Sequence, residues 1–359
     1  KPVKRGEALD WIGRLPATFM LLQPPSWMDD VWTDVARMRT LNMMQSQKGQ
    51  EQHLCLAQGS LVLTRDGYIP IEEVAAGDEV LTHRGRWRKV LVARMTGEGR
   101  EVVDLRAQGV AGLRLTPDHK LWTRLADGAR AVESAANTDP GWLTAEEVVG
   151  HYVNLKLPPI EASTLTAAEC WLIGRWLADG NVGVRGDFWV SIGRAKLSEF
   201  ERRAGEFAGT RSNGTAVQIR LKGLSNAMVD VINRCGRRAA GKRVPAELLT
   251  LEADLAGEVL SGYLSGDGHY IASRSRWQAS SVSRALLLGI ALLAQRVHAQ
   301  SASLAPGRPG GESVIEGRIV TTQQEWVLSF NDGSSCGRKQ PFILDDGAWK
   351  RVRSADPAG

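Results

Sequence analysis

The chain has 359 residues, enough for two or three domains that each bury a core of their own. A net charge of +5 and an isoelectric point near 9.1 permit a nucleic-acid partner without requiring one. The four cysteines are widely spaced and form no CxxC pair, which argues against a disulfide framework or a zinc knuckle and predicts a reducing, cytoplasmic location. The longest apolar run, Ala285 to Ala294, is too short to span a membrane, so we expect no membrane association.

Residues 1–54 differ in composition from the rest, with Trp and Met at helical spacing between Trp27 and Met44 and a polar run after them. The segment lacks an initiator Met and is too short for a core, so we expect the chain to begin inside a larger protein. The polar run followed by His53-Leu54-Cys55 resembles the segment that precedes the cofactor-binding motif of amino-group DNA methyltransferases. The alternative is an arbitrary helical segment of another host protein.

From Cys55 onward, short apolar runs alternate with turn residues. Asp66-Gly67 lies between two such runs and predicts a hairpin, because both residues tolerate a positive φ. Thr144 to Glu147 has the spacing of a capping box and predicts a short helix. The remaining runs predict strands at 61–64, 68–71, 79–82, 102–105 and 112–115. We therefore expect a compact all-β unit over residues 55–157.

The periodicity becomes helical near residue 160. A second capping box, Thr166 to Glu169, opens an apolar helix that runs to Ala178, and another apolar helix is expected from Ala253 to Ser265. Other helices are expected at about 196–207, 225–235 and 283–298, strands at 188–192, 216–221, 271–279 and 314–330, and a loop at 303–313. The two halves of this region parallel each other. The β pattern returns over 342–354, where we expect the chain to stop without a closing element.

Cys55 lies where the composition of residues 1–54 gives way to alternating apolar runs and turns. It is a candidate for chemistry on the preceding peptide bond. Its thiol can attack the carbonyl of Leu54 and replace the amide by a thioester, provided that the leaving nitrogen receives a proton. His119 is the candidate proton donor, and Thr116 can hydrogen-bond nearby. The alternative is that Cys55 is a small buried residue and His119 a turn histidine.

Taken together, these residues resemble the Hint (hedgehog/intein) splicing domain of inteins. The matching motifs are Cys55-Leu56-Ala57, Gly59-Ser60, Val62, Asp66-Gly67, Pro70–Val74, Gly77–Leu81 and Thr116-Pro117-Asp118-His119. The resemblance implies that Cys55 is the first intein residue and that the flanking extein segments are its partners. Intein splicing also needs a late acidic group and a terminal His-Asn pair, and this chain has no His-Asn pair. We expect the chain as given to form the thioester at most.

The two apolar helices share a pattern of small residues followed by an acid and glycine. Gly174 with Ala178, and Gly262 with Gly266, lie on one helical face, which predicts close helix packing. The helices would end in Asp179 and Asp267, 88 residues apart, so these carboxylates would meet at the base of the pair. Two carboxylates held close repel each other unless a cation or a shared proton relieves them. Mg²⁺ fits because it favours oxygen ligands and phosphate substrates. The glycines after them, Gly180 and Gly268, predict a left-handed turn.

This pair of motifs resembles the LAGLIDADG homing endonucleases, which place two such helices at a pseudo-twofold axis. Both motifs in one chain imply a monomer that cuts an asymmetric site in double-stranded DNA with Mg²⁺ bound by Asp179 and Asp267. Lys242-Arg243-Val244-Pro245 resembles a block between the two motifs in intein endonucleases and implies an auxiliary role for Lys242. For a single motif, the alternative is a capped core helix.

Residues 181–245 hold 13 Lys and Arg against 5 Asp and Glu, a net charge of +8 that suits binding to phosphates. The candidate DNA-binding residues on or beside the expected strands are Arg194, Lys196, Arg211, Arg220 and Lys222. Such a run can also be a solvated surface.

The sequence thus predicts a multidomain chain in which an all-β, horseshoe-like Hint domain is interrupted by an α+β domain of two repeats. The expected parts are an extein fragment (1–54), the Hint domain (55–157), the endonuclease (158–335) and the start of the returning Hint segment (336–359). Two alternatives stay open: an insert that has decayed to DNA binding only, and a fragment whose function is that of a DNA methyltransferase.

Overall fold

The computed structural model describes residues 56–127, 131–214, 216–315, 318–333, 343–344 and 347–358. The chain divides into two units between His53 and Leu54, and all described residues belong to the second. Cys55 and the expected extein fragment therefore lie outside the described residues. Within the described ranges, no helix combines the length and the apolar character needed to cross a lipid bilayer.

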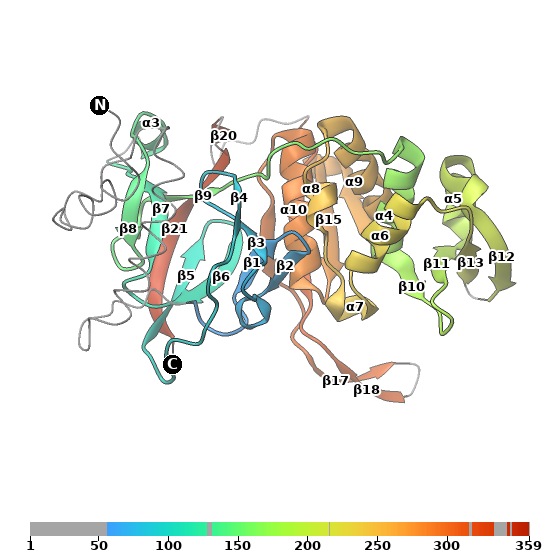
Figure 1. The fold of residues 1–359 in the computed structure, drawn as a ribbon, viewed down its shortest axis with the longest axis horizontal. Coiled ribbons are helices and arrows are strands. Elements are labelled where there is room, and N and C mark those ends of the chain that lie inside the picture. Colours follow the sequence, from blue (N-terminus) through green and yellow to red (C-terminus); the bar gives the residue numbers. More distant parts are fainter. Residues whose placement is uncertain are drawn as a thin grey trace, which may run out of the picture. The chain divides into compact units, whose positions relative to one another are not determined.

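A small four-stranded sheet opens the described chain (Figure 1). It consists of β1 (Leu61–Thr64), β2 (Gly67–Pro70), β3 (Glu79–Leu81) and β4 (Trp87–Lys89), in the order β2-β1-β3-β4. The predicted hairpin is confirmed, since Gly67 has a φ of +91° and Thr64 Oγ1 accepts a hydrogen bond from Asp66 N at 3.2 Å. A Cβ at Gly67 would overlap the carbonyl oxygen of Val244, so this turn packs directly against a distant part of the chain.

A second, larger sheet joins segments from both ends of the described chain. It contains β5 (Val102–Ala107), β6 (Val110–Leu115), β7 (Lys120–Arg124), β8 (Gly141–Thr144), β9 (Tyr152–Leu155), β20 (Ile343–Leu344) and β21 (Gly347–Ala358). The order is β6-β5-β21-β9-β7-β8, and β20 pairs with β21. Figure 1 shows β21 within this sheet, where Ala358 is opposite Val102 and Ala348 is opposite Leu155. We expected these last residues to stop without closing the fold; instead β21 joins the two parts of the sheet.

The expected helix after Thr144 is wrong. The capping-box hydrogen bonds form, with Glu147 N 3.4 Å from Thr144 Oγ1, but residues 145–150 make turns. The helix is cut short because Gly150 adopts a φ of +90° and its N–H donates to Val352 of β21. The chain then enters β9. A short helix that we did not predict, α3 (Ala131–Ala136), lies between β7 and β8.

Between residues 158 and 333 the chain contains two copies of one arrangement: helix, two strands, helix, two strands. The first copy comprises α4 (Ala167–Asp179), β10 (Gly180–Val182), β11 (Phe188–Gly193), α5 (Leu197–Ala204), β12 (Ala208–Asn213) and β13 (Ala216–Leu221). The second comprises α9 (Ala253–Asp267), β14 (Gly268–Ile271), β15 (Arg276–Ser281), α10 (Arg284–His298), β16 (Ser303–Pro306) and β19 (Trp326–Asn331). Their sheets have equivalent orders, β10-β11-β13-β12 and β14-β15-β19-β16. The expectation of parallel halves is confirmed.

Shorter elements connect and decorate the two copies. Three helices join them: α6 (Asn226–Arg234), α7 (Arg238–Gly241) and α8 (Ala246–Leu249). A hairpin of β17 (Gly311–Ile315) and β18 (Arg318–Thr322) interrupts the second copy and extends away from its sheet in Figure 1. The expected loop at 303–313 is therefore wrong, because β16 and the start of β17 lie there. Pro306 is compatible with a strand here, since β16 is an edge strand.

The helices of both copies share one core with the small first sheet. Leu63 of β1 and Trp87 of β4 belong to the same buried cluster as α4 and α9. The backbone N–H of Ala246 also donates to Arg65 O at 2.9 Å. A separate core of Val103, Leu105, Leu115 and Val352 supports the larger sheet. The small sheet is thus built into the α+β part by burial as well as by chain connection.

Candidate functional site

The pair α4 and α9 forms the centre of the α+β part. α4 begins with the predicted capping box, in which Thr166 Oγ1 accepts from Glu169 N and Glu169 Oε2 accepts from Thr166 N. A Cβ at Gly174 would overlap the carbonyl oxygen of Val259 on α9, and a Cβ at Gly262 would overlap that of Trp171 on α4. The two backbones are therefore in direct contact, as the small-residue pattern predicted.

The last residue of each helix is an aspartate, Asp179 on α4 and Asp267 on α9. The helix ends are neighbours, because a Cβ at Gly266 would lie 3.0 Å from Asp179 Oδ2. Arg175 lies one turn before Asp179, is 2% exposed, and places its Nη2 2.7 Å from Asp179 Oδ2. The same nitrogen donates to Ser191 O at 3.3 Å. The structure thus brings the two predicted carboxylates together beside one buried guanidinium.

The two glycines after the aspartates differ from our expectation. Gly180 and Gly268 have φ values of −82° and −80°, so both are extended rather than left-handed. Each glycine starts a strand, β10 or β14. Glycine is needed there for space: a Cβ at Gly180 would overlap the Trp176 side chain, and one at Gly268 would overlap the Leu264 carbonyl oxygen.

Two lysines cap the C-terminal ends of the helix pair. Lys242, between α7 and α8, donates from Nζ to the carbonyl oxygens of residues 176–178 at 2.9 to 3.1 Å. Lys196 donates from Nζ to Gly266 O at 2.7 Å, at the end of α9. Both ammonium groups donate to carbonyls of the last helical turn, one of which, Trp176 O, also accepts the backbone N–H of Gly180. Their positive charges complement the negative end of a helix dipole. Lys242 is itself held by Ser283, whose hydroxyl donates to Lys242 O at 2.5 Å.

The charges at the helix ends perturb one another. Burial, and then the neighbouring charge of Asp179, raise the pKa of Asp267 to about 6, although Lys242 and Arg175 pull it down. Burial lowers the pKa of Lys242 to about 8, against the attraction of both carboxylates. Burial is the main cause of the raised pKa of Asp267, and repulsion from the carboxylate of Asp179 adds to it. A further cation at the two carboxylates would relieve that repulsion.

The donor set at the helix ends fits a Mg²⁺ ion that keeps much of its shell for water and phosphate. Mg²⁺ in phosphoryl-transfer sites is often held by one or two protein carboxylates. Asp179 and Asp267 supply two, and no group of three or more His, Cys, Asp or Glu side chains suited to a metal occurs in the described ranges. An ion bound there would take its remaining ligands from water or phosphate oxygens.

The sheets of both copies present one face to the helices and one polar face outward. In the first sheet, the residues that alternate with the buried Val190 and Ile219 are Trp189, Ser191, Gln218 and Arg220. In the second sheet, the residues that alternate with Ala279 and Leu328 are His269, Arg276, Gln278, Ser280, Ser303 and Ser329. Polar side chains on strands can read base edges in a DNA groove.

The candidate DNA-binding residues divide between different places. Arg220 lies on the outer face, where it pairs with Asp187 at 3.0 Å. Arg194, in a short 3₁₀ turn after β11, and Lys222, directly after β13, are exposed at the ends of strands of the same sheet. These three positions suit contact with a surface laid against the sheet.

Arg211 does not share that outer face. It stands directly opposite Ile219, whose side chain is buried under the helices, so both point to the helix side. Its Nη1 lies 2.7 Å from Glu201 Oε1 of α5. The sequence placed Arg211 on or beside a predicted strand, but it did not show which face of the sheet its side chain would occupy.

The candidate splicing residues lie at the end of β6. Leu115 pairs with Leu56 in an isolated antiparallel bridge, and Ala57 N donates to Arg114 O at 3.0 Å. Thr116 follows Leu115 and is buried, and His119 N donates to Thr116 O at 3.0 Å across the turn. The turn that carries both residues is therefore adjacent to the segment that begins directly after Cys55.

Sequence reasoning missed Arg175. A single arginine within an otherwise apolar helix, four residues before an acid, was a signal for a buried ion pair. Lys196 was predicted only as a DNA contact, whereas its ammonium lies on the end of α9. Nothing in the sequence indicated that the Ser283 hydroxyl holds the Lys242 backbone, because the two residues are 41 positions apart.

Comparison with known proteins identifies one family match, to the Hint domain, over residues 54–134. An alignment 104 residues long shows 32% identity to the ATP-dependent DNA helicase Hel308 of Thermococcus kodakarensis, and it covers 26% of this chain and 9% of that protein. The β-rich segment that holds Thr116 and His119 is thus a match to the Hint domain.

Two solved structures are similar at a low level. One is the N-terminal LAGLIDADG domain of DUF199/WhiA, with a TM-score of 0.29, 12% identity, and coverage of 48% of this chain and 80% of that one. The other is full-length DUF199/WhiA from Thermatoga maritima, with a TM-score of 0.30, 9% identity, and coverage of 47% and 53%.

Proposed function

We propose that the chain is an intein whose Hint splicing domain is interrupted by a LAGLIDADG homing endonuclease. The observation that carries the proposal is the topology. β21 completes the sheet of the Hint-matched segment, and two helix-strand repeats with paired aspartates are inserted between β9 and β20. Such an arrangement lets the splicing domain fold around an independent activity. In this proposal residues 1–54 are extein, 55–157 and 336–359 form the Hint domain, and 158–335 form the endonuclease.

The proposed splicing step begins at the bond between Leu54 and Cys55. The Cys55 thiolate attacks the Leu54 carbonyl carbon, a carbon–sulfur bond forms, the carbon–nitrogen bond breaks, and the amine nitrogen takes a proton. His119 is the proposed donor of that proton, with Thr116 hydrogen-bonding near the reacting peptide. Support comes from the bridge between Leu56 and Leu115, which holds the start of the intein beside the turn of Thr116 and His119.

The proposed DNA chemistry uses the helix ends. Asp179 and Asp267 would hold Mg²⁺, which supplies activation of water and stabilisation of the leaving oxygen in phosphodiester cleavage. Lys242 fixes the end of α4 and directs a buried positive charge toward both carboxylates. The outer sheet faces, with Arg194, Arg220 and Lys222, would bind double-stranded DNA. Because one chain supplies both repeats, we propose a monomer that acts on an asymmetric site.

The experiment that tests the endonuclease proposal is cleavage of DNA that carries the uninterrupted insertion site. Asp179→Asn and Asp267→Asn should each reduce Mg²⁺-dependent cutting by roughly 100-fold or more, because each removes a carboxylate that holds the ion. Asp230→Asn, an exposed aspartate on α6, is the matched control and should cut like the wild type. Equal cutting by all four proteins would refute the assignment.

A second candidate, an insert that binds DNA without cutting it, is favoured by one observation. Arg175 already pairs with Asp179 at 2.7 Å, and this internal cation can take the place of an external one. Tight binding of the insertion site with no cleavage in Mg²⁺, by a chain that is folded, would support this candidate over the nuclease.

A further inference from the structure

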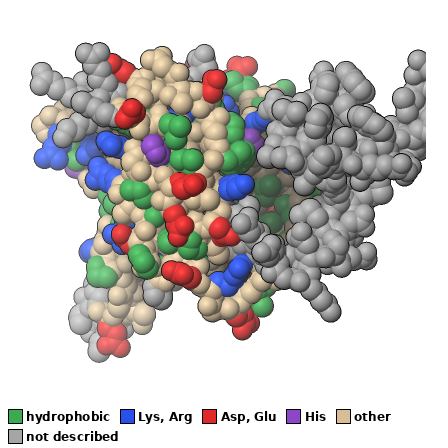
Figure 2. Space-filling model, turned by 90° about the vertical axis from the view of Figure 1, so that its left-hand side faces the viewer, with side chains coloured by type: hydrophobic (Ala, Val, Ile, Leu, Met, Phe, Trp, Pro, Cys, Tyr) green, Lys and Arg blue, Asp and Glu red, His purple; other side chains and the backbone are tan. Residues whose placement is uncertain are grey.

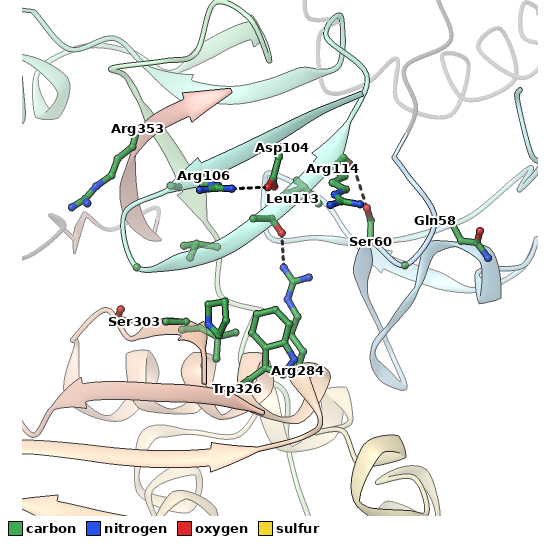
Figure 3. A pocket seen from close by; sticks show the side chains of 18 residues that line it. Gln58, Ser60, Asp104, Arg106, Leu113, Arg114, Arg284, Ser303, Trp326 and Arg353 are labelled. Atoms are coloured by element: carbon green, nitrogen blue, oxygen red, sulfur yellow. Dashed lines mark hydrogen bonds and ion pairs between the residues drawn. The ribbon is translucent and has the colours of Figure 1, made fainter. Parts of the chain in front are cut away.

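A trough lined by basic side chains lies between the larger sheet and the second repeat. It consists of two neighbouring cavities of about 740 and 380 Å³, which share Ala107, Gly109, Ser303 and Arg353 in their linings. In Figure 3, Arg284 and Trp326 rise from one wall, while Asp104, Arg106 and Arg114 come from the facing strands. The two walls are joined by a hydrogen bond from Leu304 N to Gly109 O of 2.7 Å.

The lining of this trough is strongly cationic. Its basic residues are Arg106, Arg114, Arg276, Arg284, Lys350 and Arg353. Among the described residues, Asp104 is the one acidic residue of the lining, and it lies 3.3 Å from Arg106 Nη2. Arg114 and Arg353 are exposed, and Arg106 is exposed as well although it pairs with Asp104. Six cations and one carboxylate in a concave surface favour a polyanionic occupant.

Two of the cations are held in the walls by hydrogen bonds to backbone carbonyls. Arg284, the first residue of α10, donates from Nη2 to Gly112 O at 2.8 Å, and its guanidinium lies 5.1 Å from the Trp326 ring centre. Lys350 is 2% exposed and donates from Nζ to Ala302 O at 2.6 Å. These hydrogen bonds hold both cations in place, and the carboxylate of Asp104 favours the charged form of Arg284. Low-dielectric walls then focus the positive potential into the trough.

The trough continues the outer face of the second sheet. Arg276, Ser303 and Ser329 belong both to that outer face and to the lining of the smaller cavity. From there the lining leads through Arg353 to residues 58–60, in the Hint-matched segment. A ligand laid along the outer sheet face would therefore meet the basic side chains of β5, β6 and β21.

We propose that this trough binds the phosphate backbone of duplex DNA, so that the Hint domain itself forms part of the DNA-binding surface. The proposal rests on the proposed DNA-binding function and extends it to Arg106 and Arg353, which lie on β5 and β21 and outside both repeats. Contacts to phosphates position the duplex and carry no sequence information. The Hint arginines therefore contribute affinity at any DNA sequence.

The test measures binding of the full chain to a fluorescent, random-sequence duplex of about 30 base pairs, without Mg²⁺, across a range of salt concentrations. Arg106→Gln and Arg353→Gln should each weaken binding by roughly three- to tenfold near 0.1 M salt and lower the slope of log K against log salt by about 0.9. Arg351→Gln is the matched control. It is an exposed arginine on the same strand that donates to Gly150 O and lines neither cavity.

The outcomes separate this inference from the proposed function. Wild-type affinity and slope in both trough variants, with thermal melts that show a folded protein, would overturn the trough while leaving the endonuclease proposal intact. A loss in these variants combined with unchanged cutting by Asp179→Asn would support the trough and refute the nuclease assignment. A wild-type chain that does not bind the duplex would overturn both.

Discussion

Asp267 shows how a buried carboxylate lowers the stability of the protein that carries it. Its pKa is raised from 3.8 to about 6, first by burial and then by the charge of Asp179. Between those two pH values the folded chain binds a proton that the unfolded chain releases. The free energy of unfolding therefore falls as the pH rises through this window and stays lower at neutral pH.

We predict that Asp267→Asn raises the free energy of unfolding by about 1–3 kcal/mol near pH 7.5, because the amide carries no charge to bury. Urea denaturation measures the change, which should shrink as the pH falls toward 4. Asp230→Asn on α6 should leave stability unchanged at both pH values. Mg²⁺ should raise the melting temperature of the wild type more than that of Asp267→Asn, and a variant less stable than the wild type at neutral pH would contradict the prediction.

Residue types at this site were predictable, and their surroundings were not. The two aspartates and their glycines were visible in the sequence because small residues recur four apart on one helix face. Strand register and packing between distant segments decide three other features: the ion pair of Arg175, the contacts of Lys242 with backbone carbonyls, and the orientation of the Arg211 side chain toward the helices. Periodicity carries no information about those contacts.

The helix pair is the element that positions the site. Its geometry depends on glycine at the crossing, since the backbones of α4 and α9 leave no space for a Cβ at Gly174 or Gly262. Any side chain there pushes the helices apart and moves Asp179 away from Asp267. Packing, and not helix propensity, explains these glycines, because glycine inside a helix costs roughly 1 kcal/mol relative to alanine.

We predict opposite effects for two glycine substitutions on α9. Gly262→Ala should lower the free energy of unfolding by about 1–3 kcal/mol, because the methyl group would overlap the Trp171 carbonyl oxygen. Gly257→Ala should be neutral or stabilising by up to about 1 kcal/mol, since its Cβ would meet only Val297 side-chain atoms, at 3.8 Å. Chemical denaturation of both variants provides the comparison, and a neutral Gly262→Ala would show that the crossing can relax.

In the molecule as a whole, β21 is the strand that joins the last described residues to the sheet formed by the first half of the chain. This strand pairs with β5 and β9, whose sequence positions lie about 200 or more residues earlier, so the larger sheet is complete only after the α+β part has been synthesised. Val352 then joins Val103, Leu105 and Leu115 in the small second core. The thiol chemistry proposed at Cys55 depends on a sheet whose central strand comes from the far end of the chain.

We predict that the full chain releases its N-terminal segment at the bond between Leu54 and Cys55 when dithiothreitol is added, as a thioester should. A chain that ends at residue 346 should release its N-terminal segment at least about tenfold more slowly. It lacks β21, so the sheet that positions Thr116 and His119 is incomplete. Mass spectrometry identifies the cleavage site, and Cys55→Ala should abolish the release. Equal release by the shortened chain, with far-UV circular dichroism showing retained helices, would argue that β21 has no part in the reaction.

Features that arise within a few residues of one another could be predicted from the sequence. These include the hairpin at Asp66-Gly67, the capping box of α4, the approximate bounds of both central helices and the presence of a repeated helix-strand unit. Other features became known from the fold: Gly180 and Gly268 are extended, Lys242 caps α4, and β21 lies inside the larger sheet. Local features follow from backbone preferences and side-chain spacing, which depend only on residues that are neighbours in the sequence. The others follow from contacts between segments that meet only after folding, where steric overlap and unpaired hydrogen-bonding groups decide among arrangements that the sequence leaves open.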